Sequence, residues 1–224
     1  MDLSIIIPFL NEEIRLKKNV VYYRKISKIL NAEIIFVDGQ SHDRSSYYAT
    51  KVSSKVYNCR PQRARQMNLG AANANGKYLL FLHADTILND ISIKSLENII
   101  NNLEWGFFSI SFNSNKTKYK LLSKCINTRS KLFNYSTGDQ CLLIKKELFN
   151  KINGFKDLDL MEDVEISNRL KKLFSPHILP GFAMTSHRKW ESHGFLRTIA
   201  KMRILRFMYF IGFSTKFLNK LYYK

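Results

Sequence analysis

The sequence predicts an α/β fold, namely one domain with a mostly parallel central sheet flanked by helices, followed by a basic helical extension. Strand-like apolar runs occur at residues 3–7, 34–37 and 79–82. Runs of this length are typical of central strands whose two faces are both covered by helices. Helix-like stretches separate the runs, so we expect strand–helix–strand units with right-handed crossovers. The 224 residues suffice for one sizeable core, and we place the domain at residues 1–193 and the extension at residues 194–224.

The first half of the chain is expected to alternate strands with helices. Pro8 should end the first strand, and Asn11 should cap the helix that follows, with Glu12 and Glu13 near the positive end of its dipole. The apolar positions expected on the buried face of this helix are Ile14, Val21, Ile26 and Leu30. The later elements are expected to be strands at 34–37, 55–58 and 78–82 and helices at 43–53 and 62–74.

The second half of the chain has a less regular pattern. We expect helices at residues 91–102, 120–134 and 145–150 and strands at residues 107–112 and 140–144. Met161, Glu162 and Asp163 should open an amphipathic helix, whose apolar positions are Val164, Ile166, Leu170 and Leu173. Beyond residue 194, basic side chains alternate with aromatic and aliphatic ones.

The chain is strongly basic, with 36 Lys and Arg against 18 Asp and Glu and a formal net charge of +18. Such an excess favours nucleic acid, an anionic membrane or phosphorylated ligands as neighbours. Two alternatives to an enzyme follow: a basic nucleic-acid-binding protein, and a peripheral protein whose amphipathic extension lies on anionic lipid. Acids clustered at strand ends would be poor neighbours for a phosphate backbone, so we expect no nucleic-acid partner.

Cysteine usage and hydropathy indicate a cytoplasmic protein that can also lie at the inner face of the cell membrane. Cys59, Cys125 and Cys141 have neither metal-ligand nor redox spacing, which fits a reducing compartment. The N-terminus lacks the basic start and cleavage site of a signal peptide. The longest apolar stretch near the C-terminus, residues 207–213, is far shorter than the ~20 residues needed to span a bilayer.

Acidic side chains occur where an α/β sheet binds its ligands. Asp38 and Asp85 each follow a strand, at the carboxyl edge where open sheets form their binding crevice. A carboxylate there can hold a divalent cation and, through it, a diphosphate. The alternative role is to cap the next helix. No G-x-G-x-x-G follows the first strand and no G-x-x-x-x-G-K-[ST] loop occurs, which disfavours a dehydrogenase and a P-loop nucleotidase.

Six separate segments carry recognisable motifs in a fixed order. They are Ile5-Ile6-Ile7-Pro8-x-x-Asn11-Glu12, Val37-Asp38-Gly39-x-Ser41-x-Asp43, Arg63-Ala64-Arg65-Gln66-Met67-Asn68-x-Gly70, Phe81-Leu82-His83-Ala84-Asp85, Thr137-Gly138-Asp139-Gln140 and Met161-Glu162-Asp163. This set resembles the family-2 glycosyltransferases over roughly residues 3–193. The resemblance implies the GT-A fold, a single Rossmann-like domain that binds a nucleotide sugar. The set is most similar to a short bacterial subgroup, some members of which are associated with arsenosugar biosynthesis.

The resemblance implies an inverting enzyme that moves one sugar from a nucleoside-diphosphate sugar to an acceptor hydroxyl. Asp163 would be the general base and Glu162 its orienting neighbour. An ordinary helix N-terminus is the alternative for this pair. Asp85 would hold Mg²⁺ or Mn²⁺. His187 or His193 would reach the metal from the C-terminal side, unless each is an ordinary polar surface or core residue. The acceptor is left open and can be lipid-linked or hydrophobic.

The other implied contacts fall on both substrates. Asp38 would accept a hydrogen bond from the nucleotide base, with a helix cap as its alternative role. Arg65 would add positive charge at the phosphates, unless it is a solvated helix arginine. Trp190 would line the acceptor pocket, unless it is a core aromatic residue. The remaining donor-side residues are Pro8, Asn11, Glu12, Gly39, Asn68, His83 and Ala84, and the remaining acceptor-side residues are Gly138, Asp139 and Gln140.

The chain departs from the family pattern at two places. His83 replaces the first acid of the D-x-D motif, so Asp85 is expected to carry the cation almost alone. The Q-x-x-R-W motif of processive polysaccharide synthases is missing, and residues 186–190 are only a partial echo of it. Because no spanning helix is expected either, the sequence favours transfer of a single sugar over processive synthesis.

Overall fold

The computed structural model describes residues 2–99, 103–187, 190–191 and 194–223. The strands are β1 (Leu3–Phe9), β2 (Glu33–Asp38), β3 (Val56–Asn58), β4 (Tyr78–Phe81), β5 (Ile87–Leu88), β6 (Trp105–Phe112), β7 (Leu143–Lys145) and β8 (His177–Thr185). The helices are α1 (Glu13–Ile29), α2 (Ser45–Thr50), α3 (Arg63–Ala72), α4 (Asp90–Ile99), α5 (Thr117–Phe133), α6 (Lys146–Lys151), α7 (Glu162–Leu170), α9 (Phe195–Phe210) and α10 (Thr215–Tyr223), with a short 3₁₀ helix, η1, at Gly138–Gln140.

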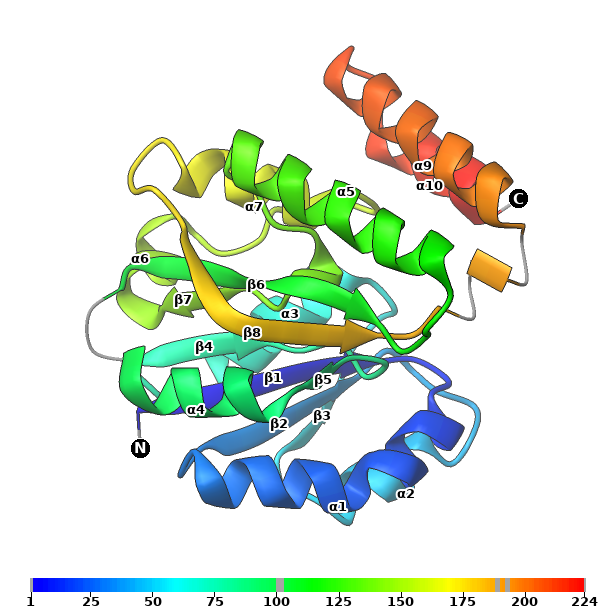
Figure 1. Cartoon of the computed structure of the whole chain (residues 1–224). Helices are drawn as coiled ribbons and strands as arrows, with labels where there is room; N and C mark the ends of the chain where they lie inside the picture. Colours follow the sequence, from blue (N-terminus) through cyan, green and yellow to red (C-terminus); the bar gives the residue numbers. More distant parts are fainter. Residues whose placement is uncertain (1, 100–102, 188–189, 192–193, 224) are drawn as a thin grey trace.

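All these strands form one mixed sheet in the order β3-β2-β1-β4-β7-β6-β8-β5 (Figure 1). β1 is parallel to β2 and β4, β2 to β3, and β6 to β8. The pairs of β4 with β7, β6 with β7 and β5 with β8 are antiparallel. The predicted α/β fold, with a mostly parallel central sheet flanked by helices, is therefore confirmed.

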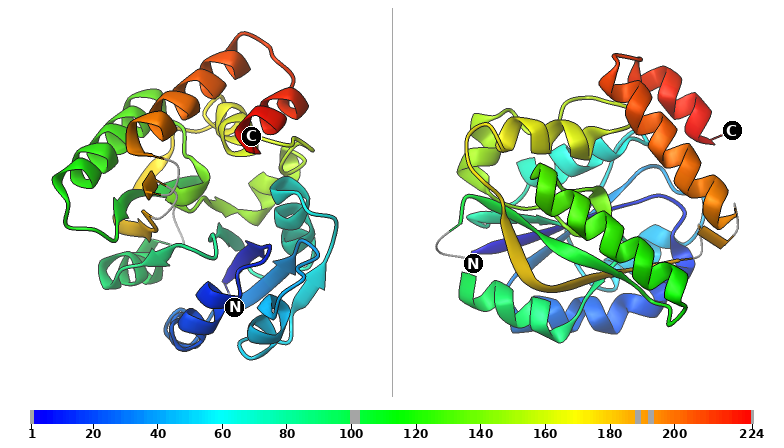
Figure 2. Two further views of the ribbon diagram at one scale, coloured as in Figure 1. Left: turned by 90° about the vertical axis from the view of Figure 1, so that its right-hand side faces the viewer. Right: turned by 45° about the horizontal axis from the view of Figure 1, so that its top comes forward.

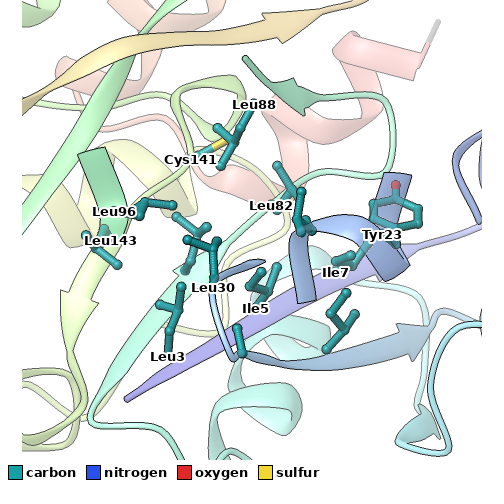
Figure 3. Close-up of a cluster of buried hydrophobic side chains, with 14 of the residues drawn as sticks. Leu3, Ile5, Ile7, Tyr23, Leu30, Leu82, Leu88, Leu96, Cys141 and Leu143 are labelled. Carbon is teal, nitrogen blue, oxygen red and sulfur yellow. The ribbon is translucent and has the colours of Figure 1, made fainter. Parts of the chain in front are cut away.

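Helices cover both faces of this sheet, and that is why its central strands are unbroken apolar runs. Successive residues of a strand point to opposite faces. Ile5 accordingly packs with Tyr23 of α1 and Leu96 of α4 on one face (Figure 3). Ile6 packs on the other face with Met67 of α3 and with residues of α6 and α7. The two cores hold the carboxyl ends of β1 and β4 in fixed positions.

Pro8 does not end the first strand, contrary to the prediction. β1 continues through Pro8 to Phe9, and these two residues pair with Val37 and Asp38 of β2. On the other side of β1, the register with β4 stops at Ile6. The missing N–H of Pro8 therefore faces the side where no strand continues, and no ladder hydrogen bond is lost.

The first helix differs from the prediction at its cap and on its buried face. Asn11 lies before the helix with φ of 53°, and its side-chain oxygen accepts a hydrogen bond from the His42 N–H. The cap position falls on Glu12, whose side chain makes no capping bond. Ile14 and Val21 are 73% and 76% exposed. The buried face includes a polar residue that an apolar pattern skips, and consists of Leu16, Asn19, Tyr23 and Ile26.

The sequence pattern does not predict β5 and β8, and it misplaces the start of β7. β8 contains Pro180 and Gly181, which interrupt a strand-like pattern, and its register with β6 shifts between Phe108 and Ser109. Gln140, expected to begin a strand, lies instead in η1, where it completes a capping box with Thr137. Irregular strands of this kind leave little periodic signal.

The C-terminal helices pack on the domain (Figures 1 and 2). Leu205 of α9 and Leu218 of α10 are buried against Tyr135, Met161 and Val164. The extension is thus a helix pair docked on the domain, and contact of its outer surface with lipid stays a prediction. Within the described residues, no helix combines the length and apolar character needed to cross a bilayer.

Candidate functional site

A cleft of about 800 Å³ opens at the carboxyl ends of β1 and β4. Two walls face each other across it, and Figure 2 (left) views the molecule from this side. The wall that we call the floor follows the strand ends, η1 and the starts of α3 and α7, and includes Pro8, Glu12, Arg63, His83, Ala84, Asp85, Gly138, Asp139, Glu162 and Asp163. The wall that we call the roof comes from α5, α9 and α10, and includes Leu122, Ile126, Arg129, Ile199, Met202, Arg203, Arg206 and Tyr222.

His83, Asp85 and Asp139 meet on the floor as a candidate metal site. One ligand atom from each residue lies within 4.8 Å of the other two, and Nδ1 of His83 is 3.5 Å from Oδ1 of Asp139. Carboxylate oxygens suit Mg²⁺ and Mn²⁺, and an imidazole nitrogen suits transition metals. The donor set therefore fits a divalent cation. Asp139, predicted on the acceptor side, lies beside Asp85 here, so a cation at this site would have a second carboxylate within reach; the roles predicted for both residues stay predictions.

The turn η1 connects this cluster to the acids at the start of α7. The Gly138 N–H donates to Oδ2 of Asp163 at 2.8 Å, and the next residue along the chain is Asp139. A Cβ on Gly138 would lie 2.3 Å from Cε1 of His83. Only glycine lets the backbone approach the imidazole this closely, so Gly138 positions His83 as well as Asp163.

Asp163 and Glu162 are neighbours in different environments. Asp163 accepts two backbone hydrogen bonds, from Gly138 and from Val164, each 2.8 Å long. Glu162 is only 6% exposed. Burial, and after it the charge of Asp163, raise the pKa of Glu162 above its ordinary range, while the charge of Arg63 acts in the opposite direction. The two backbone hydrogen bonds fix the Asp163 carboxylate in position, whereas burial favours the protonated form of Glu162, so Asp163 is the better placed of the two to act as a base.

Arg63, not Arg65, lines the cleft. Arg65 forms a forked ion pair with Asp157 on the outside of the protein, with Nε–Oδ1 and Nη2–Oδ2 distances of 3.0 and 2.7 Å. Residues two apart on a helix point about 200° apart, and the electrostatic neighbours of Arg63 are Glu162, Asp139 and Asp85. The structure therefore places the Arg65 side chain outside the cleft in which it was predicted to contact the phosphates.

Several predicted donor-side residues organise loops next to the cleft rather than lining it. Asp38 is buried, and its oxygens accept hydrogen bonds from the Ser41 N–H at 2.8 Å and from the Ser41 and Ser46 hydroxyls. Gly39 donates its N–H to the Phe9 carbonyl, in the turn that follows β2. Asn11, which follows β1, is connected to this turn because its side chain accepts a hydrogen bond from the His42 N–H. The base contact predicted for Asp38 stays a prediction.

Three further predicted residues have structural partners away from the cleft. Asn68 binds the backbone of Phe155 twice, donating at 2.8 Å and accepting at 2.9 Å. Gln140 is fully buried, and its Oε1 accepts a hydrogen bond from the Ser130 hydroxyl at 2.7 Å. His187, expected at the metal, has Nε2 3.6 Å from Glu191 and lies outside the His83–Asp85–Asp139 cluster. His193 lies outside the described residues.

Trp190 lies in the cleft wall and in an aromatic cluster, and its predicted contact with the acceptor stays a prediction. It lines the cleft, and its ring also packs edge-on against Phe112 at a centroid distance of 6.0 Å. On the roof, Arg129 and Arg206 are cleft residues that no motif indicated. The sequence indicated them only indirectly, because basic and apolar side chains alternate in the segments 120–134 and 194–224.

Comparison with known proteins identifies the family. The model of glycosyl transferase family 2 matches residues 4–151. A search of curated proteins found no match. S. aureus TarS 1-349 in complex with UDP is similar in structure, with a TM-score of 0.60 and 18% identity over 83% of this chain and 60% of that chain. Mannosyltransferase PcManGT from Pyrobaculum calidifontis, in complex with GDP-Man and Mn²⁺, is also similar in structure. Its TM-score is 0.59, and the two sequences are 16% identical over 82% of this chain and 56% of that chain.

A third similar structure is glucosyl-3-phosphoglycerate synthase from Mycobacterium tuberculosis in complex with Mg²⁺ and UDP, with a TM-score of 0.54 and 14% identity over 83% and 69%. This chain spans less than two thirds of the TarS and PcManGT chains. These likenesses confirm the GT-A-like fold, and the family match covers the segments that supply the predicted motifs up to η1. The arsenosugar subgroup stays a prediction. Because the family model spans well over half of its residues, this chain belongs to glycosyl transferase family 2.

Proposed function

We propose that this protein transfers one sugar from a nucleoside-diphosphate sugar to an acceptor hydroxyl, with inversion at the anomeric carbon. The observation that carries the proposal is the position of η1. Its first residue, Gly138, holds Asp163 through a backbone hydrogen bond, and its second residue, Asp139, belongs to the His83–Asp85 cluster. One rigid turn thus sets a candidate base beside a candidate metal site, at the edge of the sheet where α/β folds bind nucleotides.

Asp163 is the general base in this proposal. Its two backbone hydrogen bonds fix the carboxylate in place, and an ionised carboxylate can accept the proton of an acceptor hydroxyl as that oxygen attacks the sugar. The attacking oxygen and the departing diphosphate lie on opposite sides of the anomeric carbon, which inverts it. Glu162, with its raised pKa, is the neighbour that more readily keeps a proton.

His83, Asp85 and Asp139 would hold Mg²⁺ or Mn²⁺. A divalent cation bound there offsets the negative charge of the diphosphate as it leaves. Arg63, which faces the same acids, supplies a second positive charge to the phosphates. PcManGT in complex with GDP-Man and Mn²⁺, and the mycobacterial synthase in complex with Mg²⁺ and UDP, are examples of this fold with a nucleotide and a metal together.

The deciding experiment compares the wild type with Asp163→Asn. Nucleoside diphosphates and nucleotide sugars are first screened with Mn²⁺ by thermal shift, because a ligand that binds the native state raises its melting temperature. We then expect Asp163→Asn to lower kcat by about 10²- to 10⁴-fold, the usual contribution of a general base, while nucleotide affinity stays near wild type. Asp159→Asn is the matched control, since Asp159 also lines the cleft. Wild-type turnover in Asp163→Asn would refute the mechanism.

We further propose that the outer surface of α9 and the turn to α10 rests on an anionic membrane, where a hydrophobic or lipid-linked acceptor is available. Phe207, Phe210 and Ile211 are 64%, 59% and 57% exposed. The two helices also carry the exposed basic residues Lys216 and Lys220 on α10 and Arg203 on α9, the last of which borders the cleft as well. An exposed apolar surface with basic neighbours favours the interface of an anionic bilayer.

Vesicle sedimentation tests this surface. Burying one Phe side chain is worth about 1.5–3 kcal/mol, so Phe207→Ser together with Phe210→Ser should weaken binding to phosphatidylserine-containing vesicles by tenfold or more, as ~1.4 kcal/mol is a factor of ten. Val21→Ser is the control, because Val21 is 76% exposed on α1, on the opposite side of the molecule (Figure 1). Equal binding by the two variants would rule out this docking surface.

A further inference from the structure

Two arginines face each other in the roof of the cleft. Arg129 of α5 and Arg206 of α9 both line it, and both guanidinium groups lie near the ring of Tyr135, at 5.0 and 6.0 Å from its centroid. Two cations against one aromatic ring repel each other. Burial, and then the charge of Arg206, lower the pKa of Arg129 to about 10. The arrangement is costly in the free protein, so it calls for a compensating partner.

The described residues compensate this pair only in part: besides the Tyr135 ring, Nη2 of Arg129 donates a hydrogen bond to the Ser130 hydroxyl at 3.3 Å. Neither arginine forms an ion pair with an acid in that part of the chain. The Nε atoms of both are buried without a hydrogen-bond acceptor. Elsewhere in the protein, arginines such as Arg65 and Arg169 do have carboxylate partners. An anion site requires positive charge and free hydrogen-bond donors that face a cleft. Arg129 and Arg206 offer both, since they line the cleft and their Nε donors have no acceptor among the residues that the structure describes.

We propose that Arg129 and Arg206 bind a phosphate monoester carried by the acceptor, an inference that rests on the sugar transfer proposed above. The charge of Asp163 acts on Arg129, so the pair lies toward the candidate base. The His83–Asp85–Asp139 cluster and Arg63, on the floor, already account for the donor's diphosphate. A phosphate monoester carries a charge of about −1.5 to −2 near pH 7, which matches two arginines.

The other side chains of the roof indicate that the part of the acceptor bound beside the phosphate is apolar. Leu122 and Ile126 of α5, with Ile199 and Met202 of α9, form an apolar lining next to the two arginines. A molecule with an apolar body and a phosphate fits both parts of the roof at once. A lipid phosphate and a small phosphorylated compound share this chemistry, and the apolar length that binds best distinguishes them.

The test measures binding of two phosphate probes by calorimetry, independently of turnover. Phenyl phosphate represents the small compound, and dodecyl phosphate in neutral detergent micelles represents the lipid, with phenol and dodecanol as uncharged counterparts. We expect the full-length protein to bind the phosphates and not the counterparts. Arg129→Gln and Arg206→Gln should each weaken binding about tenfold or more, since each removes a charge-assisted contact. Arg197→Gln, an exposed residue of α9 outside the cleft lining, is the matched control and should bind like the wild type.

A second measurement does not depend on how the variants fold. Phosphate affinity of the wild type should fall between about pH 7.5 and about pH 5, because the probe gains a proton near pH 6. Wild-type phosphate binding in both Gln variants overturns the proposal. So does an equal loss of affinity for UDP with Mn²⁺, which would assign the arginines to the donor. Phosphate binding through this pair in a protein that binds no nucleotide sugar would instead sustain the anion site and refute the proposed sugar transfer.

Discussion

The floor and the roof of the cleft are held in place in different ways. On the floor, Asp163 receives two backbone hydrogen bonds, and His83 lies against Asp139 and the backbone of Gly138. On the roof, Arg129 and Arg206 have no acidic partner in the described chain. The floor is thus pre-organised by its own contacts, whereas the roof would be completed by the anion that we propose for it. Under the two proposals above, the rigid geometry of the floor serves the donor and the unpaired charge of the roof serves the acceptor.

The largest effect should come from breaking the metal cluster on the floor. Asp85→Asn and Asp139→Asn each remove one carboxylate ligand, and we expect each to weaken Mn²⁺ binding by about a hundredfold or more, since even partners outside the ligand set are worth about 10- to 100-fold. A titration followed by electron paramagnetic resonance measures free Mn²⁺ directly. Asp159→Asn, outside the cluster, should change little. Normal Mn²⁺ affinity in Asp139→Asn would show that Asp139 is not a ligand and that Asp85 is the only carboxylate of this cluster that binds the cation.

A methyl group at Gly138 should disturb the whole floor without removing any ligand. The new Cβ would meet the His83 ring at 2.3 Å, and overpacking of this kind costs about 1–3 kcal/mol. We therefore expect Gly138→Ala to lower the melting temperature by about 2–4 °C for each kcal/mol and to weaken Mn²⁺ binding as well.

Gly212→Ala is the control for this substitution. Gly212 has φ of 94° and no atom near its added Cβ, so its variant should lose stability through backbone strain alone and keep its Mn²⁺ affinity. Unchanged Mn²⁺ affinity in Gly138→Ala would show that the imidazole is not held by this turn.

The floor could be predicted from the sequence to the extent that its residues follow strand ends. Asp85 lies where its motif placed it, because a buried apolar run fixes where a strand stops and which edge the next residues reach. The central strands were predictable for the same reason. Asp163 follows no strand; it lies in the first turn of α7, where its motif predicted the start of a helix. The proximity of Asp139 to His83 could not be predicted, since only the fold shows that η1 bends toward that imidazole.

The roof was beyond sequence reasoning for a physical reason. Arg129 and Arg206 stand on helices far apart in the chain, and their meeting over Tyr135 depends on how α9 docks through Leu205. No local periodicity encodes that docking. Asn68 and Gln140 could not be placed from the sequence for a related reason, because polar residues within a motif can also form contacts inside the scaffold, here with the Phe155 carbonyl and the Ser130 hydroxyl.

Arg63 and Arg65 offer a comparison within one helix. Arg63→Gln should weaken binding of UDP with Mn²⁺ by about tenfold, as expected for one charge-assisted contact. Arg65→Gln removes the same charge from the outer side, where Asp157 is its partner, and should leave nucleotide affinity unchanged. Both affinities can be measured by calorimetry. If Arg65→Gln has the larger effect, α3 presents its other side to the donor.

The smallest effect should be a gain of stability at Glu162. The folded protein binds the Glu162 proton more tightly than the unfolded chain does, since burial and Asp163 raise the pKa of Glu162 above its ordinary value of 4.5. The free energy of unfolding therefore falls as pH rises above that value. Glu162→Gln removes this loss, so its melting temperature should exceed that of the wild type near pH 8 and approach it near pH 4.

The same substitution should leave Asp163 in its two backbone hydrogen bonds, so a fall in turnover would come from lost orientation of the base rather than from its removal. Glu147→Gln is the matched control, because Glu147 has an 84% exposed side chain on α6. If the melting temperatures of Glu162→Gln and the wild type change in parallel across this pH range, the charge of the buried Glu162 carboxylate is balanced by another group in the folded protein. The obvious source of such compensation is Arg63, the cation next to it on the floor. In that case Arg63 and Glu162 would form one unit, and the stability of the floor, like that of the roof, would depend on how its arginine is paired.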